Sequence, residues 1–284
     1  MEFAKLQATG NDFIVIDTFP AIAGEAKQSN KDWSKLAQAI CNRHFGVGAD
    51  GLLLILPSKK ADLRLRVFNS DGSEAEVCGN GLRCVAKYWA EKASNKPRDR
   101  ELTIETIVGI RSAEPLFVEG QVEQVRLSLG KPQFFIPEQF KPDKIPFQIQ
   151  INDKGLALTF VSLGNPHAVA FIKEPVADFP LTKLGPEVEC HPAFPQRVNF
   201  EVVRVLDRHH LQARVWERGA GETLSCGSGA GAIAVAAHQH HYVDNRVEVI
   251  FNGGTLDVEW DGEGEVMLTG PVEIIFTGRW LKGK

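Results

Sequence analysis

Two cysteines stand in the same local pattern, Cys-Gly-x-Gly, at Cys78 and at Cys226. An alternating strand pattern precedes each motif and a helix pattern follows it, so both thiols are predicted to lie at the start of a helix. The first helical turn carries unpaired backbone N–H groups and the positive end of the helix dipole, which favour a bound carboxylate and a thiolate. A free cysteine has a pKa of about 8.5, and this placement is expected to lower the pKa toward the range of a general base.

The segments around the two cysteines are copies of each other. Leu63 to Ala86 aligns without a gap on Leu211 to Ala234, at a constant offset of 148 residues. The Gly-Asn pair that ends at Asn11 recurs at Asn165, at a slightly different offset. Duplication makes a shared role for the two thiols far more credible than either motif alone, and it predicts two halves of similar fold.

The repeat indicates which strands and helices position the two thiols. In each copy a strand, Leu63–Phe68 or Leu211–Trp216, leads through a polar loop into a helix. These helices, expected at 80–92 and 228–240, are apolar around much of their circumference and should be buried. The fold class predicted is α/β (α+β), with two pseudo-symmetric halves, each a curled, mostly antiparallel sheet around a central buried helix. One further helix is expected at 31–44, with Asn30 as its N-cap.

The domain division follows from the same repeat. Residues 1–122 form the predicted first half, which carries Cys78, and residues 123–271 form the second half, which carries Cys226. Residues 272–284 are expected to return to the first half, with a last strand at Glu273–Thr277.

Two thiols that face one carbon from opposite sides are suited to inverting its configuration. A thiolate removes the proton alpha to a carboxylate while a thiol delivers a proton to the other face. The helix N-termini stabilise the charge that builds on the carboxylate. Such a mechanism requires no metal, pyridoxal or nicotinamide cofactor, and the two thiols titrate as a coupled pair.

Composition excludes several other classes of protein. The 284 residues include 32 basic and 36 acidic side chains, which give a net charge of −4. This charge does not predict a basic surface that would bind nucleic acid or an anionic membrane. The N-terminal residues have no signal-peptide pattern, and no apolar run is long enough to cross a bilayer. Five cysteines without a Cys-x-x-Cys pair predict reduced thiols in the cytoplasm rather than disulfides or a zinc site.

The sequence closely resembles the diaminopimelate epimerase family nearly from end to end. The matching segments are GNDFIVID at 10–17, RHFGVGADG at 43–51, FNSDGSEAEVCGNGLRC at 68–84, LGNPHAV at 163–169, RVNF at 197–200 and ERGAGETLSCGSGA at 217–230. The resemblance implies a cofactor-independent epimerase that interconverts LL- and meso-diaminopimelate on the route to lysine and peptidoglycan. It also implies a cytoplasmic homodimer of two pseudo-symmetric α/β halves.

The same resemblance assigns roles to individual residues. It makes Cys78 and Cys226 the acid/base pair, tuned by His167 and Glu217. The groups implied to bind the substrate are the pairs at the two helix starts, four asparagines and two charged residues: Gly79, Asn80, Gly227, Ser228, Asn11, Asn69, Asn165, Asn199, Glu217 and Arg218. The amides can donate to a carboxylate and accept from an ammonium, and Arg218 offers a bidentate fork to a distal carboxylate.

Three positions depart from the family pattern. Gly51 stands where many members have a glutamine that reaches the substrate, so that contact is not carried over. Gln7 and its neighbours replace a usual His-Gly pair before the first Gly-Asn. Phe276 occupies a position that is in some members a tyrosine associated with dimer contacts, which leaves the dimer interface less defined than the active site.

Two alternatives stay open. Related cofactor-independent racemases and epimerases act on proline, hydroxyproline or histidine, and a related isomerase acts in phenazine synthesis. In a different class, the thiols would belong to a non-catalytic redox or ligand-binding protein. A dinucleotide site at Gly46–Gly51, which matches G-x-G-x-x-G, is disfavoured because a helix pattern precedes it and a strand pattern follows it.

Overall fold

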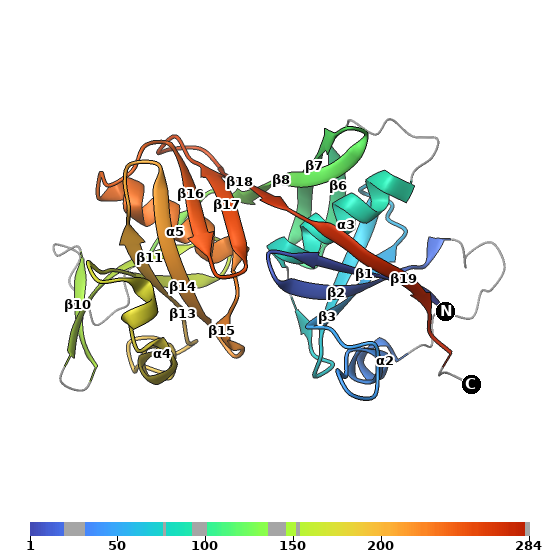
Figure 1. Cartoon of the computed structure of the whole chain (residues 1–284), viewed down its shortest axis with the longest axis horizontal. Helices are drawn as coiled ribbons and strands as arrows, with labels where there is room; N and C mark the ends of the chain where they lie inside the picture. The colour runs from blue at the N-terminus through green and yellow to red at the C-terminus, as the bar shows by residue number, and fades with distance from the viewer. Residues whose placement is uncertain (20–31, 76–77, 93–100, 136–145, 152–153, 282–284) are drawn as a thin grey trace. The chain divides into compact units, whose positions relative to one another are not determined.

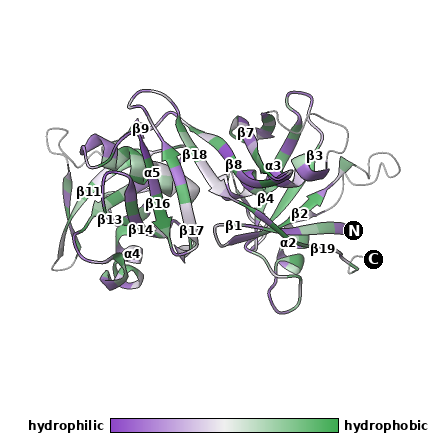
Figure 2. Ribbon diagram, turned by 45° about the horizontal axis from the view of Figure 1, so that its top comes forward, coloured by the Kyte–Doolittle hydropathy of each residue, from purple (hydrophilic) through white to green (hydrophobic). Residues whose placement is uncertain are grey.

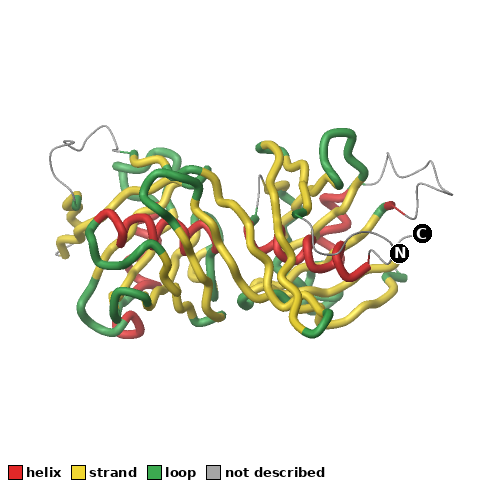
Figure 3. Tube along the Cα trace, turned by 90° about the horizontal axis from the view of Figure 1, so that it is seen from above, coloured by secondary structure: helices red, strands yellow, loops and turns green. Residues whose placement is uncertain are grey.

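The computed structural model describes residues 1–19, 32–75, 78–92, 101–135, 146–151 and 154–281. The chain divides into two compact units, Met1–Leu127 with Gly270–Lys284, and Ser128–Thr269. The sequence placed the division at 122/123 and 271/272, a few residues from these bounds. In both units strands make up most of the fold and helices are few (Figure 3), and the predicted α/β fold class is confirmed.

The first unit consists of nine strands and two helices among the described residues. The strands are β1 (Glu2–Ala8), β2 (Asn11–Asp17), β3 (Gly51–Leu56), β4 (Leu63–Asn69), β5 (Glu74–Ala75), β6 (Leu102–Thr106), β7 (Gly109–Val118), β8 (Gln121–Gly130, which runs on into the second unit) and β19 (Glu273–Arg279), and the helices are α2 (Trp33–Ile40) and α3 (Gly79–Lys92). The hydrogen-bonded order is β19-β1-β2-β3-β4-β6-β7-β8, with β5 paired to β4. Among these pairs of described strands, β2/β3 and β4/β6 are parallel and the others are antiparallel.

The second unit repeats this arrangement. Its strands are β9 (Gln133–Phe134), β10 (Phe147–Ile151), β11 (Lys154–Ser162), β12 (Pro166–Phe171), β13 (Asn199–Val205), β14 (His210–Glu217), β15 (Gly221–Thr223), β16 (Arg246–Phe251), β17 (Gly254–Glu259) and β18 (Val266–Pro271), and its helices are η2 (Val176–Asp178), α4 (Leu181–Glu189) and α5 (Gly227–Gln239). The parallel pairs are now β12/β13 and β14/β16. The crossover helices α2 and α4 therefore correspond, as do the central helices α3 and α5 (Figure 1).

The C-terminal strand β19 pairs antiparallel with β1, which Figure 1 shows as the red strand beside the blue one. In the second unit β10 pairs with β11 in the same place. Strand β19 thus takes the place in the first unit that β10 takes in the second, so the returning last strand completes the repeat.

Helix α5 is buried because its residues are small or apolar, whereas α3, also expected to be apolar, buries the polar side chains of Asn80, Arg83 and Lys87 as well. Residues 229–237 of α5 are all buried, and α5 contacts strands β11, β12, β13, β16 and β17. A Cβ on Gly231 would lie 2.5 Å from the Leu129 side chain, so Gly231 lets that side chain pack directly against the helix. The strands around each helix alternate between hydrophobic and hydrophilic residues (Figure 2), as expected for sheets with one face on the core. Among the described residues, no helix has both the length and the apolar character needed to span a membrane.

The crossover helices differ from expectation. The helix expected at 31–44 is shorter: α2 begins at Trp33 and ends at Ile40, and its N-cap is Asp32, whose carboxylate accepts from the Lys35 N–H at 3.1 Å. The proposed cap Asn30 lies outside the described residues. Helix α4 was not expected, because Gly185 and Pro186 in its interior disfavour a helix. Packing overrides this preference, since the Trp216 ring lies where a side chain on residue 185 would be.

Candidate active site

Cys226 is the N-cap of α5 and lies at the start of the buried helix. Its sulfur accepts a hydrogen bond from the Gly229 N–H at 3.4 Å, and the Ser228 hydroxyl lies 3.5 Å from the same sulfur. Cys78 stands in the same relation to α3, where the Gly81 N–H lies 3.4 Å from its sulfur. Both thiols therefore sit at a helix start with a backbone N–H directed at the sulfur.

The direction of the Cys226 pKa shift corrects the expectation from the helix start. Burial raises the pKa of this thiol well above its ordinary value, and the negative charges of Glu217 and Glu201 act in the same direction. The Ser228 hydroxyl and the Gly229 N–H lower the pKa but do not outweigh the loss of hydration at a residue that is 5% exposed.

A chain of polar side chains leads from Cys226 into the core of the second unit. Asn165 Nδ2 donates to the Ser228 hydroxyl at 3.2 Å, and Asn165 Oδ1 lies 3.1 Å from His167 Nε2. His167 Nδ1 in turn lies 2.6 Å from Glu201 Oε1. Strands β12 and β13 bring these groups together.

The turn between β14 and β15 carries the charged residues that the sequence singled out. Glu217 accepts from the Thr223 hydroxyl at 2.6 Å, and the exposed Arg218 donates from Nη1 to the Gln196 carbonyl at 3.2 Å. Asn199 is buried and holds this turn, since its Oδ1 accepts from the Arg218 N–H at 2.9 Å.

Helix α4 fixes the same turn from the outside. The Glu189 carboxylate accepts from the Gly219 N–H at 2.9 Å and from Trp216 Nε1 at 2.8 Å. Helix α2 does the equivalent in the first unit, where Ser34 and Gln38 donate to the carbonyls of the β4–β5 loop at 2.7 and 2.6 Å. Each crossover helix thus holds the loop that precedes Cys78 or Cys226.

In the first unit an asparagine amide faces Cys78. Asn11 Oδ1 lies 3.9 Å from the Cys78 sulfur and accepts from Asn80 Nδ2 at 3.2 Å. Asn80 is buried, and its own Oδ1 accepts no hydrogen bond from the described residues. Asn69 is exposed at the end of β4, where its Nδ2 donates to the Ser73 hydroxyl at 2.9 Å.

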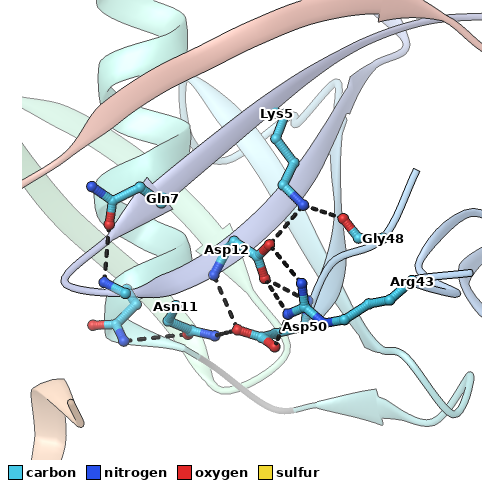
Figure 4. Close-up of polar contacts among 9 residues, drawn as sticks. Lys5, Gln7, Asn11, Asp12, Arg43, Gly48 and Asp50 are labelled. Atoms are coloured by element: carbon cyan, nitrogen blue, oxygen red, sulfur yellow. Dashed lines mark hydrogen bonds and ion pairs between the residues drawn. The ribbon is translucent and has the colours of Figure 1, made fainter. Parts of the chain in front are cut away.

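The orientation of the Asn11 amide is set by a network of charges behind it. Figure 4 shows Asp12 and Asp50 beside Asn11, with Arg43 in contact with both carboxylates. Asp50 Oδ2 accepts from Asn11 Nδ2 at 2.7 Å. Because a carboxylate can only accept there, the nitrogen of the Asn11 amide faces Asp50 and its oxygen faces the cysteine.

Asp12 anchors this network to the core. Lys5 Nζ lies 2.6 Å from Asp12 Oδ2 and also donates to the Gly48 carbonyl. Burial opposes ionisation of Asp12, but the hydrogen bonds and charges of Arg43 and Lys5 outweigh it and lower its pKa to about 2.

The positions that depart from the family pattern have physical reasons. A Cβ on Gly51 would lie 2.8 Å from the Phe68 carbonyl oxygen, so the backbone here admits only glycine. Gln7 accepts from the Gly10 N–H at 2.9 Å and so supports the turn before Asn11. Phe276 lies on β19 and packs edge-on against Phe3.

The G-x-G-x-x-G segment connects two elements, and two histidines at the end of α5 contact neighbouring side chains. The segment with the G-x-G-x-x-G pattern connects α2 to β3, so it ends where a strand begins rather than where a helix begins. His238 contacts Trp260, and His240 contacts Thr159 at 2.7 Å. Among the residues that the structure describes, no three His, Cys, Asp or Glu side chains are grouped so as to hold a metal ion.

Two residues of the site were missed in the sequence. Asp50 lies inside a quoted segment, but only its contact with Asn11 shows what it does. Glu201 follows RVNF directly, and its signal was a carboxylate within the apolar strand pattern V-N-F-E-V-V.

Comparison with known proteins gives consistent matches over the whole chain. The family model described as diaminopimelate epimerase matches residues 3–135 and 159–275. A diaminopimelate epimerase of Carboxydothermus hydrogenoformans is 42% identical over 284 residues, covering 99% of this chain and 100% of that protein. One from Pelotomaculum thermopropionicum is 43% identical, with 99% of each chain covered.

Solved structures of more distant proteins share the fold. A phenazine biosynthesis protein of the PhzF family from Bacillus anthracis superposes with a TM-score of 0.72 at 19% identity, covering 99% of each chain. A hydroxyproline epimerase from Agrobacterium vitis, with bound trans-4-hydroxy-L-proline, superposes with a TM-score of 0.71 at 16% identity, covering 98% of this chain and 91% of that one. At these identities the likeness concerns the fold alone.

Proposed function

The chain belongs to the diaminopimelate epimerase family, and we propose that it interconverts LL- and meso-2,6-diaminopimelate by two-base proton transfer between Cys78 and Cys226. One observation carries the mechanism: each unit directs a backbone N–H at a cysteine sulfur, at 3.4 Å, from the start of its buried central helix. An isomerase that inverts an α-carbon needs a base and an acid of this kind.

Proton transfer runs through the two cysteines as a coupled pair. One cysteine, as a thiolate, removes the α-proton while the other, as a thiol, delivers a proton to the opposite face. The step leaves the first cysteine as a thiol and the second as a thiolate, which are the starting groups for the reverse reaction. The chemistry requires both sulfurs to reach the same carbon.

The carboxylate next to that carbon must accept negative charge as the proton leaves. The backbone N–H groups at the starts of α3 and α5 are suited to hold it, with the pairs Gly79-Asn80 and Gly227-Ser228 as its contacts. Preorganised N–H donors stabilise this charge without rearranging during the reaction.

The second amino acid end of diaminopimelate needs its own polar partners. We assign its carboxylate to Arg218 and its ammonium to Glu217, both in the turn that Glu189 and Asn199 hold in place. Four asparagines complete this set: Asn11, Asn69, Asn165 and Asn199. His167 acts on Cys226 through Asn165 and Ser228, since no direct bond joins the ring to the sulfur among the described contacts.

We place the reaction in the synthesis of lysine and peptidoglycan precursors and in the cytoplasm. All five cysteines are free thiols in the structure. We further propose a homodimer, supported by the exposed side chains of Ile275 and Phe276 on β19, which are 51% and 46% exposed. Phe276→Ser should convert such a dimer to a monomer in light-scattering measurements, whereas an unchanged mass would exclude this strand from the interface.

The assay for the proposed function follows formation of meso-diaminopimelate from the LL isomer. Cys78→Ala and Cys226→Ala should each abolish turnover, because each removes one of two obligatory proton carriers. Cys190→Ala, which removes an exposed thiol outside the site, is the matched control and should retain it. Racemisation of proline, hydroxyproline or histidine without action on diaminopimelate would assign the chain to a related activity, and no turnover at all would favour a redox or binding role.

A further inference from the structure

A fully buried His–Glu pair lies beneath the Cys226 site. The side chains of His167 and Glu201 are both 0% exposed, and Nδ1 lies 2.6 Å from Oε1. The second carboxylate oxygen of Glu201, Oε2, accepts no hydrogen bond from the described residues. A bare carboxylate oxygen in the core is costly, so this pair needs an explanation other than packing.

The first unit shows that the fold does not require a polar pair at this position. In the β2/β3 pair Phe13 stands opposite Gly51, as His167 stands opposite Asn199 in the β12/β13 pair. Two residues beyond Gly51 is Leu53, at the place of Glu201. Phe13 and Leu53 are buried apolar side chains, so the same site in the first unit is filled without any charge.

The match extends to the central helices. A Cβ on Gly81 of α3 would lie 3.1 Å from the Leu53 side chain, and one on Gly229 of α5 would lie 3.1 Å from Glu201 Oε1. Leucine and glutamate thus occupy equivalent places against equivalent glycines. The difference between the two units lies in chemistry and not in shape.

The hydrogen bonds from this pair to the cysteine have a direction. Asn165 Oδ1 is an acceptor, so His167 Nε2 carries a proton. Asn165 Nδ2 donates to the Ser228 oxygen, which leaves the hydroxyl hydrogen of Ser228 for the Cys226 sulfur.

The direction depends on the proton count at His167. If Nδ1 held the only proton, Nε2 would accept from the Asn165 amide nitrogen. The amide would then be reversed, and the Ser228 hydroxyl would donate to Asn165 instead of to the sulfur. When Nδ1 shares a proton with Glu201, Nε2 can hold a second proton. The hydrogen bonds then run from Nε2 through Asn165 and Ser228 to the Cys226 sulfur. Burial raises the pKa of the Glu201 carboxyl, which agrees with a shared proton.

We propose that Glu201 is a positioning residue for proton transfer at Cys226: it holds a proton at His167 Nδ1 and thereby keeps the Ser228 hydroxyl directed at the sulfur. This hydroxyl stabilises the thiolate that remains after Cys226 has delivered its proton. Glu201 itself does not reach the substrate. The inference rests on the proposed function, since it concerns the same proton transfer.

Three variants separate this role from packing. Glu201→Leu copies Leu53 of the first unit, and the double variant His167→Phe/Glu201→Leu copies the whole apolar pair. Glu201→Gln keeps the shape, and its amide N–H can donate to Nδ1, which leaves the ring proton on Nε2. The matched control is Thr159→Val, which removes a buried hydrogen bond to His240 at the opposite end of α5.

The kinetic readout is kcat and KM for epimerisation, with the thermal midpoint of each variant. Both apolar variants should keep or raise the midpoint, yet lose about 10- to 100-fold in kcat with KM within about twofold, the loss expected for one hydrogen bond to a charged group. Glu201→Gln should recover at least about tenfold of that loss, and Thr159→Val should match the wild type. The proposal is overturned if Glu201→Leu keeps the wild-type kcat, or if Gln and Leu are equally impaired.

A second readout needs no substrate. In protein with ¹⁵N-labelled histidine, Nε2 of His167 should be protonated and Nδ1 should show a bound or shared proton. In Glu201→Leu the ring should hold a single proton whose position is no longer fixed, so one ring nitrogen should be bare. Identical His167 spectra in the two proteins would contradict the proposal. If the wild type failed to act on diaminopimelate, the proposed function would be wrong, while these spectra would still decide the state of the Glu201–His167 pair.

Discussion

Asp12→Asn is expected to lower the free energy of unfolding, and the structure sets the size of this loss. The substitution keeps the shape of the side chain and an oxygen that can accept from the Asp50 N–H at 3.0 Å. It removes the charge that pairs with Lys5 and Arg43 at 2.6 and 2.8 Å. The Lys5 ammonium, in a side chain only 8% exposed, then loses its ion-pair partner.

The size of the effect follows from the pKa of Asp12, which falls from 3.8 to about 2. Each pKa unit corresponds to about 1.4 kcal/mol, so the ionised carboxylate contributes roughly 2 kcal/mol to stability at neutral pH. Asp12 is only 17% exposed, so solvent screening of this pair is limited. Because the folded pKa is the lower one, the contribution is complete above about pH 5 and falls to about 1 kcal/mol at pH 3.

The assay is urea unfolding at pH 7 and pH 3, followed by hydrogen exchange in peptides of the first unit. The wild type should exceed the variant by about 2 kcal/mol at pH 7 and by about half as much at pH 3. Asp244→Asn is the control, since it breaks an exposed pair with Arg208 that solvent screens, and it should cost less than Asp12→Asn. A difference that does not shrink on acidification, or one no larger than the control's, would refute the electrostatic reasoning.

Three shorter predictions concern the site itself. Ser228→Ala removes a group that lowers the pKa of Cys226, so alkylation of that thiol by iodoacetamide should move to higher pH; an unchanged or lower midpoint would contradict this assignment. Asp50→Ala frees the Asn11 amide and should lower kcat by about tenfold, the effect of one charge-assisted hydrogen bond, and wild-type kinetics would exclude that role. Gly51→Ala should destabilise the protein by about 1–3 kcal/mol in thermal unfolding, because its Cβ would meet a strand carbonyl at 2.8 Å, and an unshifted midpoint would show that the strand yields.

The sequence predicted the features that depend on local patterns. The central helices begin within one residue of the predicted starts, because the Cys-Gly-x-Gly motifs mark their first turns. The fold class also follows from repeats and strand patterns that can be read along the chain, whereas the pairing of the last strand with β1 is visible only in the structure. Helix α4 could not be predicted in this way, because Gly185 and Pro186 disfavour it locally and packing against Trp216 stabilises it.

What the sequence could not show are properties that arise from packing. The helix start at Cys226 was visible and suggested a lowered pKa, but burial determines the direction and depends on strands far away in the chain. Asp50 contacts Asn11 and Glu201 contacts His167, and neither contact has a signature in residue spacing. Supporting residues of this kind become visible only when hydrogen bonds are traced outward from the reactive atoms.

The measurement that tests the two-thiol mechanism most directly is the position of deuterium after a brief reaction in heavy water. Starting from the LL isomer at low conversion, the meso product should carry one deuterium at the inverted carbon while the recovered LL isomer carries none, because one sulfur removes protium and the other delivers deuterium. Deuterium entering recovered substrate as fast as product, or a product that retains its protium, would show that a single base acts on both faces.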